Sequence, residues 1–88
     1  MDKEKELEII THFSDKLIED IDQTENLSAS EKRLILISIG SNILSSEWSS
    51  LMVNIGAKKA NAFIDGVLEI TKKVAVEKAI SFASKEED

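Results

Sequence analysis

The 88-residue sequence contains no cysteine and no proline, and it has only three glycines and one histidine. Without cysteine, the chain has no disulfide, no thiol nucleophile and no cysteine-ligated zinc or iron–sulfur site. Without proline, few points force a helix to end, so the sequence predicts long helices. The composition, 42% hydrophobic and 32% charged, is typical of a folded globular chain rather than a disordered one.

The lack of cysteine and the small numbers of histidine and glycine argue against an enzyme. His12 is the only histidine, and one histidine without cysteine cannot form the usual zinc site. The glycines at positions 40, 56 and 66 stand apart, so no phosphate-binding loop or nucleophile elbow is present. The acidic residues are spread along the chain without an Asp-rich calcium loop. We therefore expect no catalytic residue, no metal and no cofactor.

The formal charge of -6 is unevenly distributed. Residues 1–25 hold nine acidic residues against three lysines, and residues 26–56 are balanced. Residues 57–85 hold six lysines against three acidic residues, and the chain closes on an acidic tail at 85–88. This pattern indicates that the acidic first segment and the basic third segment lie near each other, alongside the neutral middle one. An acidic chain is also a poor candidate for nucleic-acid binding, so we expect no nucleic acid as partner.

Apolar spacing predicts three helices, at about 3–24, 30–54 and 57–84. Ser28 and Glu31 fit a capping box at the start of the second helix, and Ser30 is an equally good cap. Gly56 can adopt the left-handed conformation that ends this helix. Gly40 and Gly66 fall inside helices, and close backbone approach between packed helices is the favoured explanation for them. The first helix carries its apolar residues on one face: Leu7, Ile10, Phe13, Leu17, Ile18 and Ile21.

These elements predict an all-α fold, a three-helix antiparallel up-down-up bundle formed by a single domain, residues 1–88. The middle helix carries apolar residues on more than one side, so one bundle face would not cover them all. Since monomers rarely expose large apolar patches, we expect the bundle to be completed by formation of a homodimer. The residues expected at the intersubunit or partner contact are Ile35, Ile39, Val53, Trp48, Leu51, Met52 and Ile55.

Glu47 is the one charged residue expected to point into the broad apolar face of the middle helix, at 100° per residue. A buried carboxylate without a partner is costly. We predict that Glu47 pairs with a lysine of the third helix or of a second copy and so sets the packing register. The alternative is that this face is open to solvent at Glu47.

The sequence thus predicts a small acidic helical module, in the cytoplasm, that binds a partner protein as an adaptor, chaperone-like subunit or inhibitor. Two alternatives stay open. One is a membrane-peripheral, bacteriocin-immunity-like factor whose third helix meets a membrane surface with its lysines. The other is an acidic inhibitor, of the kind found in phages and plasmids, that mimics nucleic acid through the first helix. A membrane span over residues 34–56 is disfavoured by their serines, asparagines and Glu47.

Overall fold

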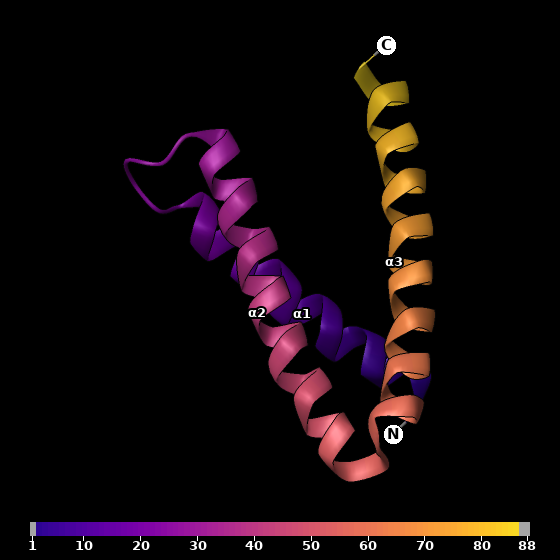
Figure 1. The fold of residues 1–88 in the computed structure, drawn as a ribbon. Coiled ribbons are helices and arrows are strands. Elements are labelled where there is room, and N and C mark those ends of the chain that lie inside the picture. Colours follow the sequence, from indigo (N-terminus) through magenta and orange to yellow (C-terminus); the bar gives the residue numbers. More distant parts are fainter. Residues whose placement is uncertain (1, 87–88) are drawn as a thin grey trace. The chain divides into compact units, whose positions relative to one another are not determined.

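A computed structural model describes residues 2–86 and contains three helices in this range, with no strand. They are α1 (Lys3–Asp22), α2 (Ala29–Ile55) and α3 (Ala57–Glu86) (Figure 1). The predicted all-α class is confirmed, and the helix ends differ from those predicted by at most two residues. Of the predicted acidic tail, residues 85 and 86 belong to α3, and residues 87 and 88 lie outside the described residues.

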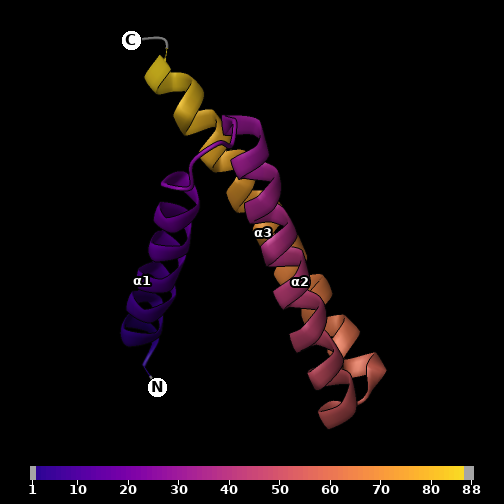
Figure 2. The same cartoon turned by 90° about the vertical axis from the view of Figure 1, so that its left-hand side faces the viewer.

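The chain divides into two compact units, Met1–Ile43 and Leu44–Asp88, whose boundary falls inside α2. The first unit contains α1 and the first part of α2, and the second contains the rest of α2 and α3. Short connections join the helices in each unit, at residues 23–28 in the first and at Gly56 in the second (Figures 1 and 2).

The connection from α1 to α2 closes the end of α1 with polar contacts. The Thr24 hydroxyl donates to the Asp20 carbonyl at 3.0 Å, and Asn26 takes a left-handed conformation with φ 67°. The Lys32 ammonium, from the first turns of α2, donates to the Asp22 carbonyl. Because the last turn of α1 has no basic residue of its own, Lys32 supplies the positive charge that favours this helix end.

The capping box at the start of α2 is confirmed, with Ser28 rather than Ser30 as the cap. The Ser28 amide donates to Glu31 Oε1 at 3.0 Å, and the Glu31 amide donates to Ser28 Oγ at 3.1 Å. Each side chain thereby accepts a hydrogen bond from an amide that has no partner within the helix. The backbone hydrogen bond from Ser28, followed by that of its side chain, lowers the pKa of the Glu31 carboxyl below its ordinary value of 4.5.

Glu31→Gln tests the capping charge through its pH dependence. A carboxylate whose pKa is lowered by folding stabilises the folded state above pH 4.5, and this stabilisation is lost as the pH falls through the folded-state pKa. Glutamine keeps an oxygen that accepts from the Ser28 amide but cannot titrate. Urea unfolding followed by circular dichroism should show the wild type more stable than Glu31→Gln at pH 7 and the two equal near pH 2. A difference that does not change with pH would contradict the role of the charge.

Burial in the first unit is greatest near the 23–28 connection. Leu17 and Ile21 of α1 are half-buried, as are residues 35, 36 and 39 of α2. From this end the two helices separate (Figure 2), and the apolar residues of the first turns of α1 stay exposed: Leu7, Ile10 and Phe13. The apolar face predicted for α1 is therefore covered only at Leu17 and Ile21, since Ile18 is also exposed.

The second unit is organised around Gly56, which alone connects α2 to α3. Its φ of 88° is the left-handed backbone conformation predicted for it. Residues other than glycine rarely adopt this conformation. The Gly56 amide donates to the Met52 carbonyl at 3.0 Å, and its carbonyl accepts from the Ala60 amide at 3.1 Å. The two buried hydrophobic residues of the described chain, Ala60 and Ile64, lie in the first turns of α3 just beyond this point.

The two helical segments of the second unit differ greatly in length. Residues 44–55 of α2 extend about 18 Å at 1.5 Å per residue, whereas the 30 residues of α3 extend about 45 Å. The α2 segment can therefore lie opposite only the first dozen or so residues of α3. From residue 65 to residue 85 every side chain of α3 is exposed.

Gly40 and Gly66 do not have the close neighbours predicted for them. A Cβ atom added at either glycine would meet no described atom within 4 Å beyond the local helix. Neither carries a left-handed backbone, since Gly56 is the glycine with positive φ in the described chain. The prediction of close helix approach at these positions is therefore wrong, because both glycines face open space within the described chain.

Gly66→Ala should stabilise the protein by about 0.5–1 kcal/mol, because alanine removes the entropic cost of glycine in a helix and meets no neighbour. Thermal or urea unfolding measures the change. Gly56→Ala is the matched control, and it should destabilise because its φ of 88° strains any residue with a Cβ. A loss of stability in Gly66→Ala would show that another surface packs closely against this position.

Candidate interaction surface

Trp48 joins α2 to α3 within the second unit. Its indole Nε1 donates to the side-chain oxygen Oδ1 of Asn61 at 2.8 Å. The indole is half-buried, and an indole in that position needs an acceptor because its N–H is otherwise removed from water. Leu44 and Leu51, on the same side of α2, are also half-buried. These residues of α2 and the buried Ala60 and Ile64 form the packed part of this unit.

The other predicted contact residues at this end of α2 are exposed. Val53 has 85% of its surface exposed, the most of any large hydrophobic residue in the described chain, and Met52 and Ile55 are exposed at 38% and 46%. Val53 also lines a shallow groove with Ser49, Ser50 and Asn54. The Ser49 hydroxyl already donates to the Ser45 carbonyl at 2.9 Å, so this polar group does not depend on water for a hydrogen bond.

Ile35 and Ile39, also predicted at the contact, belong to the first unit and are half-buried there. The structure thus places the predicted residues in three groups. Trp48 and Leu51 contribute to packing within the second unit, and Ile35 and Ile39 contribute to packing within the first. Val53, Met52 and Ile55 are the members that the described chain leaves uncovered, and we call these three the α2 patch.

Glu47 is exposed, so its carboxylate remains in contact with water. Among residues 2–86, no lysine forms an ion pair with it. The side chain precedes Trp48 on α2, and the indole turns toward α3 while Glu47 stays on the surface. Pairing with a lysine of a second copy stays a prediction.

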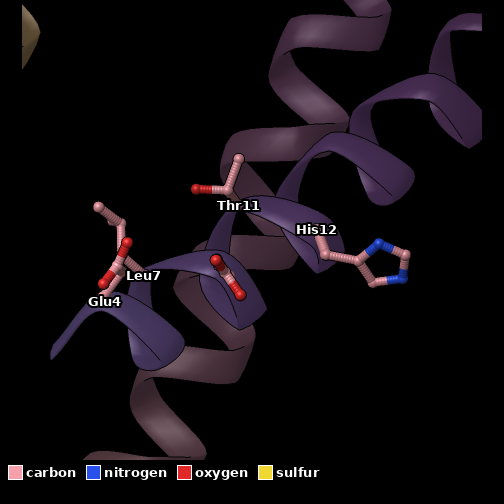
Figure 3. A pocket seen from close by; sticks show the side chains of 5 residues that line it. Glu4, Leu7, Thr11 and His12 are labelled. Carbon is pink, nitrogen blue, oxygen red and sulfur yellow. The ribbon is translucent and has the colours of Figure 1, made fainter. Parts of the chain in front are cut away.

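A depression on α1 is lined by a histidine and two glutamates. It is lined by residues of one helix only, Glu4, Leu7, Glu8, Thr11 and His12, and its side chains are exposed (Figure 3). His12 extends away from Glu4 and Leu7 in Figure 3 and stands edge-on to the Phe13 ring, with 5.0 Å between the ring centroids. An open helix face does not exclude water or hold a substrate from two sides. The depression on α1 is therefore an open surface feature of one helix.

No protein-family model, no curated protein and no solved structure matches the chain. Within residues 2–86, no three histidine or acidic side chains gather as metal ligands would. In the same range, none of the helices combines the length and the apolar character that a membrane crossing requires. Arguments about function therefore depend on the surface chemistry of the helices.

Sequence reasoning missed Asn61 as a structural residue. The signal was present, because a half-buried tryptophan requires an acceptor, and a tight turn at Gly56 brings the helix on one side alongside the helix on the other. Trp48 lies eight residues before Gly56 and Asn61 five residues after it. The amide is also the one uncharged polar side chain in the first turns of α3, between Ala57 and Ile64.

Asn61→Ala should destabilise the protein by about 0.5–1.5 kcal/mol, because the Trp48 N–H loses its acceptor. The single tryptophan makes the local effect visible, and we expect its fluorescence emission to shift to the red as water reaches the indole. Asn54→Ala, which removes an exposed amide from α2, is the matched control. Equal emission spectra for wild type and Asn61→Ala would show that this hydrogen bond does not hold the indole in place.

Proposed function

We propose that this chain is a small acidic helical interaction module that acts by binding a partner protein, as an adaptor, chaperone-like subunit or inhibitor does. The observation that carries the proposal is the exposure of large apolar side chains on all three helices, against only two buried hydrophobic residues in the described chain. Apolar surface of this extent is uncommon on proteins that act alone.

The α2 patch is the part of this surface best suited to a partner. At 100° per residue, Met52 and Ile55 lie within about 40° of Trp48 around the helix, and Trp48 is fixed by its hydrogen bond to Asn61. Val53 lies about 140° from Trp48, beside a shallow groove. A rigid aromatic residue beside exposed aliphatic side chains is the usual composition of a contact hot spot. The patch needs no rearrangement of the packed residues to receive a partner.

We also propose how the helices assemble. An up-down-up antiparallel bundle completed by a second copy would remove the exposed apolar faces from water, at about 25 cal/mol for each Å² of apolar area buried. The acidic residues of α1 and the lysines of α3 favour the approach of these helices. A second copy is thus the first partner to test.

Val53→Asp tests the proposal with little risk to the fold, because the valine side chain is 85% exposed. We expect the wild type to self-associate in sedimentation velocity at micromolar concentrations, and Val53→Asp to weaken the dissociation constant about tenfold or more with unchanged circular dichroism. Ser41→Asp adds the same charge to an exposed position of α2 and serves as control. A wild type that stays monomeric, together with an Ile39→Asp variant that folds unchanged, would refute the dimer.

A further inference from the structure

Four residues of α3 form an apolar line on its surface that the second unit leaves exposed. Phe63, Val67, Ile70 and Val74 recur at spacings of four, three and four, which aligns them along one side of a helix; we call them the α3 strip. Phe63 and Ile70 are 60% and 65% exposed. Ile70 and Val74 lie beyond the first dozen residues of α3, which are those that the α2 segment of this unit can reach.

The strip adjoins a shallow groove that suits an apolar neighbour. The groove is lined by Ile70, Thr71, Val74, Ala75 and Lys78. The Thr71 hydroxyl donates to the Val67 carbonyl at 2.8 Å, so its polar group is already paired and a covering side chain need not hydrogen-bond to it. Because the Ala75 side chain is small, there is space between the larger residues of the groove. A side chain from another helix can fit into such a space, as in knobs-into-holes packing.

The positive charge of α3 gathers along this strip. At 100° per residue, four lysines and one acidic residue fall within about 90° of its centre: Lys59, Lys73, Lys78, Lys85 and Glu77. Over residues 57–85, the other side of the helix carries two lysines and two acidic residues, Lys58, Lys72, Asp65 and Glu69, and has no net charge. Two such strips facing each other would repel because both are positively charged. The surface therefore favours an acidic helix with apolar residues as its partner.

The first helix of this chain has that chemistry. α1 holds seven acidic residues against three lysines, and its Leu7, Ile10 and Phe13 are exposed. Glu6 and Asp20 border this apolar face, where Lys3 is the one basic residue. α1 as a whole is therefore an acidic helix, with a net charge of -4, and its exposed apolar residues are of the kind that the α3 strip would receive.

We propose that α1 of one copy packs on the α3 strip of a second copy, and that the second α1 and α3 make the same contact in reverse. Stable protein interfaces bury about 1,200–2,000 Å² in total, and one contact of a few side chains is too small for that. A twofold dimer doubles it, because each surface is used on both copies. This inference rests on the proposed self-association and names the helices that meet in it.

Complementation between two variants tests the contact. Ile10→Asp damages α1, and Ile70→Asp damages the strip. Each homodimer then has both contacts damaged, whereas a mixed dimer keeps one contact intact. We expect each variant alone to weaken the dissociation constant about tenfold or more. In an equimolar mixture with one variant ¹⁵N-labelled, native mass spectrometry should find mixed dimers above the half expected for random pairing.

Matched controls separate the strip from general effects of charge. Val76→Asp introduces the same acid at an exposed position on the opposite side of α3, and His12→Asp does so on the polar face of α1; neither should weaken the dimer. Lys78→Glu should weaken the dimer more than Lys72→Glu, which makes the same charge change away from the strip. Equal effects of the two lysine variants would overturn the charge argument on which the choice of α1 depends.

The results of these experiments distinguish a failure of the α1–α3 contact from a failure of the proposed function. A dimer abolished by Val53→Asp but unchanged by Ile70→Asp would retain the proposed function and remove the α1–α3 contact. If Ile10→Asp and Ile70→Asp both fold but lose self-association, and if mixing them does not restore dimers, α1 and α3 meet within one chain and the inference is wrong. A monomeric wild type that sediments with anionic phosphatidylserine vesicles, unless Ile70 is replaced, would assign the strip to a lipid surface. A dimer lost in Ile70→Asp, kept in Val53→Asp and restored by mixing would support the contact while removing the α2 patch.

Discussion

A single residue, Gly56, joins two helices, and the packing of the second unit depends on that short connection. With one residue between them, the ends of α2 and α3 are held together, and the observed packing lies within a few turns of this connection. Ala60 and Ile64, the buried hydrophobic residues of the described chain, and the Trp48–Asn61 hydrogen bond all lie there. The left-handed backbone of Gly56 therefore decides which side chains can form a core.

The same geometry leaves the remote ends of the helices uncovered. The first unit is covered near residues 23–28 and open at the first turns of α1, just as the second is covered near Gly56 and open along α3. Apolar residues at these open ends lie beside charges of opposite sign, acidic on α1 and basic on α3. Surface that is apolar and carries one dominant charge discriminates between partners better than apolar surface alone, since a partner of the wrong charge is repelled.

Helix positions and ends could be predicted because they depend on local chemistry. The Ser28–Glu31 pair and Gly56 act within four residues of the backbone groups that they satisfy, so their patterns are readable without knowledge of the tertiary structure. Gly40 and Gly66 could not be assigned this way, because the cost or benefit of a glycine depends on what stands opposite it. The same holds for Glu47. Its helical phase suggested an apolar face, but exposure depends on how far the neighbouring helix covers that face.

Because α2 continues without interruption across the boundary at residues 43 and 44, the two units share one helix. Helix propagation is cooperative, and each added turn is stabilised by the turns already formed. Order in one unit therefore favours order in the adjoining turns of the other, even where no side chain passes between them. Stabilisation of α2 near Val53 would therefore also favour helix formation in the turns that precede residue 44.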